Sequence, residues 1–218
     1  MKKKTIKVRI TLIEDMLGMC ATADIHEKYI ASKAPDAASI EEEVEALGTD
    51  CVVENKRTVF PRENGIPILW DYQIKGMFKD SCGMLRRVPG TFSSQMTSYK
   101  KMIDGLMFPY PRKIILKIPD GATIGNCQRP LRADTAQGPR VAIADSESVP
   151  AGTTFEFDVN ILEPSIQNKM KKNKKGDVSE PMFSLEACLI EWLDYGVYRG
   201  FGQWRNSGKG RFEYEILS

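Results

Sequence analysis

The sequence lacks the residues that several common kinds of functional site require. It has a single histidine, His26, and no phosphate-binding loop of the form GxxxxGK[ST]. Its five cysteines lie far apart and form no CxxC pair, which argues against a zinc site and against a disulfide framework. A Ser-His-Asp hydrolase, a nucleotide-binding P-loop and a metal enzyme are therefore not predicted, and we expect no cofactor and no metal.

An excess of one charge and long apolar runs are missing too. The 31 Lys and Arg residues nearly balance 29 Asp and Glu, giving a formal net charge of +2. Any basic surface must therefore come from an uneven distribution of charge. The lysines at positions 2–4 are followed by a stretch that Lys7, Arg9 and Glu14 interrupt, so no export signal or membrane span is predicted. With 218 residues and thiols expected to be reduced, we predict one cytoplasmic domain without a membrane partner.

Residues 195–217 combine glycines with basic and aromatic side chains. Glycine lets the backbone reach positive φ and approach a ligand closely, while arginine, lysine and aromatic rings supply charge and stacking faces. This combination suits a phosphate backbone, although a flexible hairpin with surface charges is the alternative interpretation. The candidate residues are Arg199, Trp204, Arg205, Lys209 and Arg211, with the loop glycines Gly200, Gly202, Gly208 and Gly210.

Hydrophobic periodicity predicts the elements on both sides of this loop. Alternating apolar residues predict strands over 5–13, 112–118, 149–162 and 211–217. Asn64-Gly65 lies between two extended arms and predicts a hairpin. Steps of three and four residues predict helices over 71–87, with Asp71 as its N-cap, and over 184–193, and a short helix is expected within 93–107.

Three further segments have distinctive composition. An acidic, helical insertion is predicted at about residues 25–50, and residues 14–24 before it are expected to form a connection. A basic hairpin is predicted at about residues 125–145, with Gln137-Gly138 near its tip. A lysine-rich loop at about residues 165–178 is either a solvated linker or a nucleic-acid contact.

The order of these predicted elements along the chain resembles that of the RAMP superfamily. Its RRM-like or ferredoxin-like members include backbone subunits of CRISPR effector complexes and CRISPR-RNA processing endonucleases. Residues 59–79 are similar to a family hairpin that leads to a Lys-Gly helix start, and residues 149–157 and 200–212 resemble a core-strand opening and a C-terminal Gly-rich loop. One departure is that residues 70–74, Trp-Asp-Tyr-Gln-Ile, replace the usual Pro-Gly-Ser-Ser run. The resemblance implies a single α+β domain in which an antiparallel sheet has helices on one face, a helical insertion and a hairpin thumb.

The resemblance also implies a function. We expect a protein that binds single-stranded nucleic acid, RNA in preference to DNA, without cutting it. Copies would assemble along the strand with one another or with other CRISPR-type subunits in antiviral defence. Lys75, with the amides around Gly76, would grip a phosphate at the helix start, and bases would rest on rings of the sheet. The remaining candidate contacts are Lys79 on the same helix and Arg129, Arg132 and Arg140 on the hairpin.

Two alternative functions remain open. One is a metal-independent endoribonuclease in which His26 acts as general acid or base, with Lys28 and Tyr29 nearby. Asp24 is the nearest candidate for the acidic residue with which some relatives cut target RNA, but its surroundings do not match that motif. The other alternative is a phage or mobile-element protein that docks into a CRISPR complex, or imitates a subunit, and inhibits it.

Overall fold

The computed structural model describes residues 2–21, 57–135, 138–163 and 184–217. Asp24, His26, the predicted acidic insertion and the predicted lysine-rich loop lie outside these residues.

A four-stranded antiparallel sheet forms the centre of the fold. Its order is β12 (Phe212–Leu217), β1 (Lys2–Leu12), β11 (Thr154–Glu163) and β7 (Met107–Tyr110). Ile6 lies opposite Val159 and Val8 lies opposite Phe157, and all four side chains are buried. The period-two pattern therefore predicts the buried face correctly. The predicted strand 149–162 is in fact two, because a turn containing Gly152 separates Val149, the last residue of β10, from β11.

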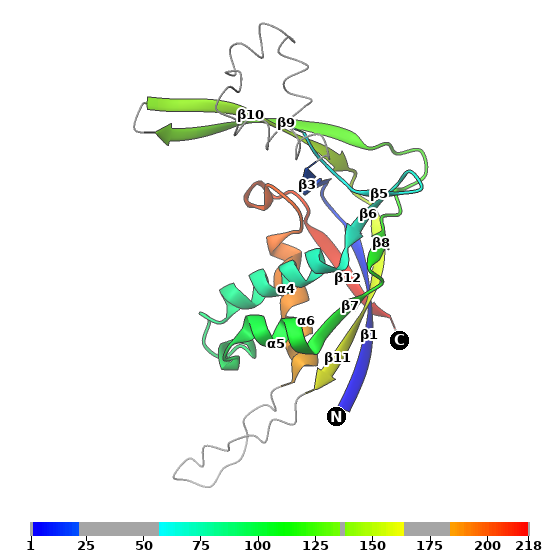
Figure 1. Cartoon of the computed structure of the whole chain (residues 1–218), viewed down its shortest axis with the longest axis vertical. Coiled ribbons are helices and arrows are strands. Elements are labelled where there is room, and N and C mark those ends of the chain that lie inside the picture. The colour runs from blue at the N-terminus through cyan, green and yellow to red at the C-terminus, as the bar shows by residue number, and fades with distance from the viewer. Residues whose placement is uncertain (1, 22–56, 136–137, 164–183, 218) are drawn as a thin grey trace, which may run out of the picture.

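Three helices cover the buried face of this sheet, which confirms the predicted α+β architecture (Figure 1). They are α4 (Asp71–Leu85), α5 (Tyr99–Leu106) and α6 (Leu185–Arg199). The rings of Phe78 and Trp192 pack with centroids 5.7 Å apart between α4 and α6. Trp192 Nε1 donates a hydrogen bond to Ser93 Oγ at 2.8 Å, which ties the short 3₁₀ helix η1 (Ser93–Gln95) to α6. None of the described helices is long and apolar enough to cross a membrane.

Two helix boundaries differ from the sequence prediction. Helix α6 continues through residues 195–199, where the sequence predicts a loop, and Gly196 in this last part lies against the ring of Phe212. A Cβ at Gly196 would be 2.6 Å from Phe212 Cζ, so only glycine fits this helix-to-strand contact. Helix α4 has Trp70 as its N-cap, and Gln73 Oε1 accepts the Trp70 N–H at 2.8 Å. The predicted cap, Asp71, is the first helical residue instead.

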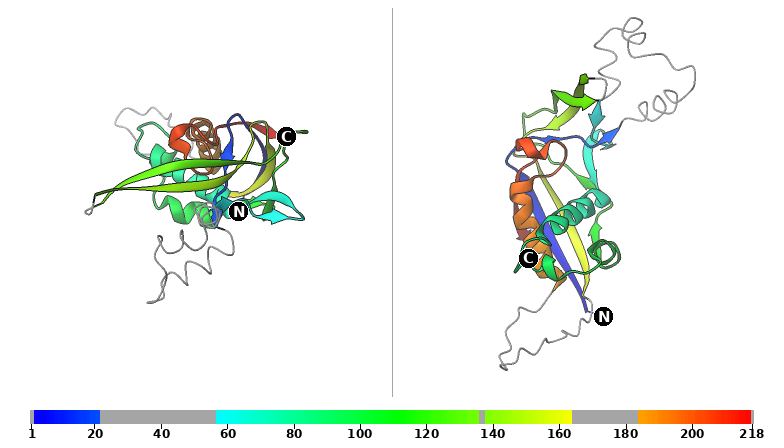
Figure 2. Two further views of the ribbon diagram at one scale, coloured as in Figure 1. Left: turned by 90° about the horizontal axis from the view of Figure 1, so that it is seen from above. Right: turned by 90° about the vertical axis from the view of Figure 1, so that its left-hand side faces the viewer.

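A second sheet carries a long hairpin. The hairpin consists of strands β9 (Gly125–Thr135) and β10 (Gly138–Val149), which lie where the sequence predicts the basic hairpin. The two strands are antiparallel, with Gly125 opposite Ser148 and Thr135 opposite Gly138. Short strands β2 (Met16–Leu17) and β4 (Thr58–Val59) pair with β10, and β3 (Cys20–Ala21) pairs with β4. Two of these strands lie in the predicted connection 14–24, because Gly18 lets the backbone approach Val59 so closely that a Cβ would be 2.7 Å from its carbonyl carbon. The hairpin projects over the helical side of the central sheet (Figures 1 and 2).

A third sheet joins β5 (Arg62–Glu63), β6 (Ile66–Trp70) and β8 (Lys113–Ile115). Asn64 and Gly65 both have positive φ, 51° and 81°, so the predicted hairpin turn is confirmed. The predicted strand 112–118 is shorter, and beyond it Lys117 forms an isolated bridge with Thr154 of β11. Strand β6 of this sheet ends at Trp70, and α4 begins at the next residue.

Candidate nucleic-acid interface

The Gly-rich loop between α6 and β12 is built on contacts with its own chain. The Gly210 N–H donates to the Asp15 carbonyl at 2.8 Å, and the Phe201 N–H donates to the Gly210 carbonyl at 2.8 Å. A Cβ on Gly210 would lie 1.8 Å from the Phe201 oxygen, and one on Gly200 would lie 2.7 Å from the Lys209 oxygen. These two glycines are therefore explained by backbone packing within the protein. Gly202 is close to β2, and only Gly208 among the four candidate glycines leaves open space.

Acidic side chains hold the basic residues of this loop. Arg205, in the 3₁₀ helix η2 (Arg205–Ser207), places Nη1 2.7 Å from Asp80 Oδ2 on α4. Arg199 Nε is 3.3 Å from the same oxygen. Lys209 Nζ is 3.1 Å from Asp15 Oδ2. All three cations are partly exposed, so these pairs are weak enough for a phosphate to compete with them.

Arg129 of β9 is in a different situation. Its side chain is 7% exposed, its Nη2 donates to Gln203 Oε1 at 2.9 Å, and its Cζ lies 5.2 Å from the centroid of the Trp204 ring. Its Nε and Nη1 are buried and have no hydrogen-bond partner among the residues that the structure describes. Leaving a buried donor unpaired costs about 1–3 kcal/mol, and more for a charged group. The hairpin and the Gly-rich loop thus meet at a cation whose donors are not used up by the described protein groups.

Trp204 forms the loop side of this junction. It has a left-handed backbone conformation with φ of 54°, and the residue is 38% exposed. Sequence reasoning left open whether the ring stacks on a ligand or packs on the sheet. In the structure its partner is Arg129 of the hairpin.

Lys75 and Lys79 contact α5 and β7. Lys75 Nζ donates to the Asp104 carbonyl at 3.1 Å and lies 4.8 Å from the centroid of the Phe108 ring. Lys79 Nζ lies 2.6 Å from Asp104 Oδ1. Because α4 begins at Asp71, Lys75 lies in its second turn, and the amide of Gly76 is inside the helix. The expectation that Lys75 marks the helix start and acts with free N-terminal amides is wrong.

The remaining predicted contacts are only partly described. Arg132 and Arg140 lie in the outer half of the hairpin, where the structure describes the backbone register but not their side chains. Arg211 is exposed, and its carbonyl accepts the N–H groups of Ile13 and Glu14. The structure therefore brings Arg129, Arg199, Trp204 and Arg205 to one junction of hairpin, loop and α4, while Lys75 and Lys79 face α5.

Sequence reasoning missed an aromatic group at the start of α4. The rings of Trp70 and Tyr72 are nearly parallel, at 12°, with centroids 6.4 Å apart. The guanidinium carbon of Arg112 lies 5.7 Å from the Trp70 centroid and 6.0 Å from the Tyr72 centroid. The two rings are visible in the sequence, but Arg112 reaches them only through the pairing of β6 with β8.

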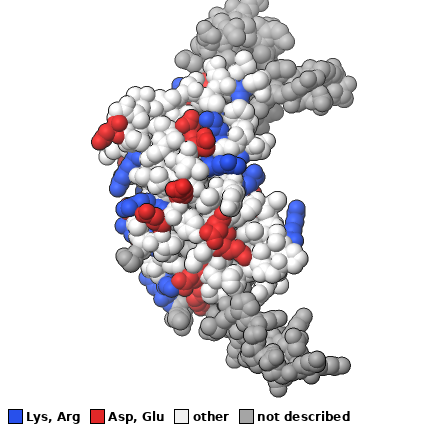
Figure 3. Space-filling view, turned by 180° about the vertical axis from the view of Figure 1, so that it is seen from behind, with Lys and Arg blue, Asp and Glu red and all other residues white. Residues whose placement is uncertain are grey.

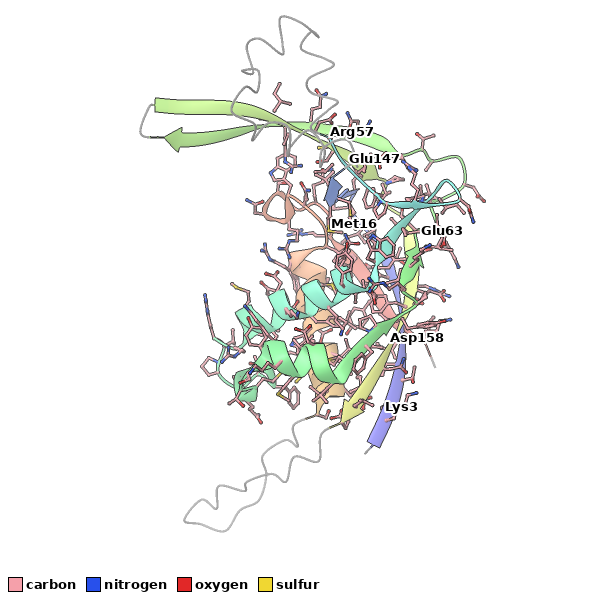
Figure 4. All side chains as sticks on the ribbon, in the orientation of Figure 1. Lys3, Met16, Arg57, Glu63, Glu147 and Asp158 are labelled. Carbon is pink, nitrogen blue, oxygen red and sulfur yellow. The ribbon has the colours of Figure 1, made fainter. Side chains whose placement is uncertain are left out.

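The open face of the central sheet carries mutually paired charges. Glu156 Oε1 accepts from Arg9 at 2.8 Å and Glu156 Oε2 lies 3.0 Å from Lys7 Nζ, and these two cations hold the pKa of Glu156 well below its usual value, at about 2. Lys3 and Asp158 lie on the same face, turned away from the helices (Figure 4). The outward positions of β1 and β11 carry no aromatic residue, and the exposed rings of this sheet are those of Phe108 and Tyr110 on the edge strand β7, opposite Asn160 and Asp158. From behind, basic and acidic side chains are interspersed and do not form one basic patch (Figure 3).

Comparisons with known proteins identify structural neighbours only. No protein-family model and no curated protein matches the chain. A chain of the Type III-B Cmr-β complex bound to cognate target RNA is 11% identical, with a TM-score of 0.48 over 100% of this chain and 61% of that chain. A chain of a Type IV-B CRISPR complex is 11% identical, with a TM-score of 0.43 over 99% of this chain and 91% of that chain. This protein thus spans about three fifths of the Cmr-β chain, and likenesses at this level do not extend to function.

Proposed function

We propose that the protein is a single RAMP-like domain that binds single-stranded nucleic acid, RNA in preference to DNA, without cutting it. Copies assemble along the strand as subunits of a CRISPR-type complex. The observation that carries the proposal is Arg129 at the junction of the hairpin and the Gly-rich loop, a nearly buried cation whose Nε and Nη1 have no hydrogen-bond partner among the described residues. A phosphate that enters this junction provides the charged acceptors that the described residues do not supply.

The surrounding groups suit a strand in contact with this junction. The half-exposed ring of Trp204 offers a stacking face, and Arg211 is exposed on the same loop. Arg199 and Arg205 share one carboxylate, Asp80, so phosphates can take its place without leaving either arginine unpaired. Binding by this route exchanges internal ion pairs for contacts with the nucleic-acid backbone.

The hairpin supports assembly in several copies. It projects beyond the helices (Figure 2), and a strand of 11 residues spans about 35 Å at the usual rise per residue. An arm of this length can cover the strand held by its own copy or reach an adjacent one.

The direct test is fluorescence anisotropy with labelled single-stranded RNA and DNA of equal sequence, at several salt concentrations. Binding to phosphates falls steeply with salt, and we expect RNA to bind more tightly than DNA. The variant Arg129→Met keeps the apolar stem, and Lys101→Met removes the same charge from an exposed position on α5. Weaker binding and a shallower salt slope only in Arg129→Met are expected, and wild-type protein that binds neither strand would overturn the proposal.

A second candidate function is favoured by the paired charges. Arg199, Arg205, Lys79 and Lys209 all have acidic partners in the protein, a state that also suits a protein-docking surface. Under this candidate the protein docks into a CRISPR complex and inhibits it. It predicts no binding to free strands and loss of target cleavage when the protein is added to a purified effector complex.

The endoribonuclease hypothesis depends on His26 and stays a prediction from the sequence. Incubation of CRISPR-repeat RNA with wild type and His26→Ala tests it. Cleavage that is unchanged in the variant would remove His26 from consideration.

A further inference from the structure

The ring pair of Trp70 and Tyr72, together with Arg112, is named here the aromatic step. Trp70 ends β6, Tyr72 lies in the first turn of α4, and Arg112 precedes β8. The nearly parallel rings and the guanidinium that lies near both form a continuous π and cation surface. None of these residues belongs to the Gly-rich loop or the hairpin.

The backbone holds the aromatic step in place. The Asp71 N–H donates to the Arg112 carbonyl at 3.1 Å, and Asp71 Oδ1 accepts from Arg112 Nη1 at 3.0 Å. Trp70 is opposite Lys113 in the β6–β8 ladder, and Gln73 caps its N–H. Strand pairing, helix capping and an ion pair thus fix the group before any ligand arrives, which lowers the entropy lost on binding.

The aromatic step also has surface that the described protein leaves uncovered. Tyr72 is 52% exposed, and the side chain of Arg112 is 68% exposed. Among the described residues, the only hydrogen bonds of the Arg112 guanidinium are those from Nη1 to Asp71. A flat ring and spare guanidinium donors on one surface match a nucleotide, which has an aromatic base and an anionic phosphate.

We propose that the aromatic step stacks an unpaired nucleobase on Tyr72, while Arg112 donates to the adjoining phosphate. This inference rests on the proposed single-strand binding and adds a base contact to it. Gln73, one residue beyond Tyr72, places Nε2 3.8 Å from Cys20 Sγ of β3. The aromatic step therefore adjoins the sheet that carries the hairpin, which allows one strand to contact both.

The experiment compares two probes of equal length and charge. One is a labelled single-stranded oligonucleotide, and the other is the same backbone made entirely of abasic sites. Anisotropy titrations use the full chain as wild type, Tyr72→Leu and Tyr72→Phe. The control is Ile190→Ala, which removes an exposed apolar side chain from α6 outside residues 195–217.

Tyr72→Leu is expected to weaken binding of the base-containing strand roughly tenfold, within the range measured for single base–aromatic contacts. The same variant should bind the abasic strand like wild type, Tyr72→Phe should retain binding of both strands, and Ile190→Ala should change neither. Equal losses on both probes, or no loss, would overturn the base contact even though single-strand binding stands. Wild type that binds no strand would overturn the proposed function itself.

Discussion

The open face of the central sheet and the helical side beneath the hairpin contain the same kinds of residue in different states. On the open face, Lys7 and Arg9 both pair with Glu156, and Arg9 pairs with Glu215 as well. On the helical side, Arg129 is nearly buried, and two of its nitrogens have no hydrogen-bond partner among the described residues. Arg112 lies near the partly buried ring of Trp70 and the exposed ring of Tyr72. The number of basic residues therefore does not distinguish a binding surface from a structural one. What distinguishes them is whether the cations are already fully paired within the protein.

The largest expected effect concerns how the loop on the helical side is built. Gly210→Ala should lower stability by roughly 2–4 kcal/mol, because it combines positive φ with a Cβ 1.8 Å from a carbonyl oxygen. Gly208→Ala is the comparison, since its φ is also positive but its Cβ would meet open space, and roughly 1 kcal/mol is expected. Thermal and urea unfolding measure both. Equal losses would mean that the close backbone contact at Gly210 is unimportant.

The next effect separates binding from stability. Arg129→Met should weaken single-strand binding roughly tenfold or more, since hydrogen bonds to charged groups contribute about 1.5–3 kcal/mol. The free protein should unfold at the same temperature or higher, because the substitution removes two unpaired buried donors. Anisotropy and differential scanning calorimetry give the two quantities. A variant that unfolds earlier and binds normally would make Arg129 a structural residue.

A third substitution is expected to strengthen single-strand binding, by a smaller factor. Asp80→Asn releases Arg199 and Arg205 from their shared carboxylate, so binding should tighten by a few fold at low salt. Asp120→Asn removes the same charge from an exposed residue outside the junction. If both variants tighten binding equally, the gain comes from net charge and not from the released arginines.

The smallest expected effect is a change in unfolding temperature on substitution of Glu156, on the open face of the central sheet. The pKa of Glu156 is depressed to about 2, so its contribution to stability is present above its ordinary pKa, near 4.5, and is lost as the pH falls toward 2. Glu156→Gln should slightly lower the unfolding temperature at pH 7, and the difference from wild type should vanish at low pH. Strand binding should not change. A clear loss of binding would contradict the structural role of this face.

Local patterns predict much of the fold correctly. Alternation identifies β1 and β11 because each strand has one buried face, and Asn64-Gly65 identifies its turn because both residues tolerate positive φ. The end of α6 and the cap of α4 were missed. Gly196 lies inside α6, where a Cβ would collide with the Phe212 ring, and Gln73 accepts the N–H of Trp70, so both boundaries involve specific contacts that residue preference does not predict.

The candidate site was predicted less completely than the fold. The sequence identifies Arg129, Arg205 and Trp204 by residue type, but it contains no signal that Asp80 pairs with Arg205 or that Gln203 contacts Arg129. These partners come from different strands, helices and loops. Their distances depend on how the second sheet and α4 meet the Gly-rich loop.

The sequence by itself determined the period of each strand and helix, the Asn-Gly turn and the composition of the Gly-rich loop, because these follow from local sterics and hydrophobic spacing. Only the tertiary structure decided which charges are paired. It also placed Arg112 beside Trp70 and Tyr72 through the β6–β8 pairing. The physical reason is that pairing and stacking act over a few ångströms between segments far apart in the chain, and chain packing alone sets those distances.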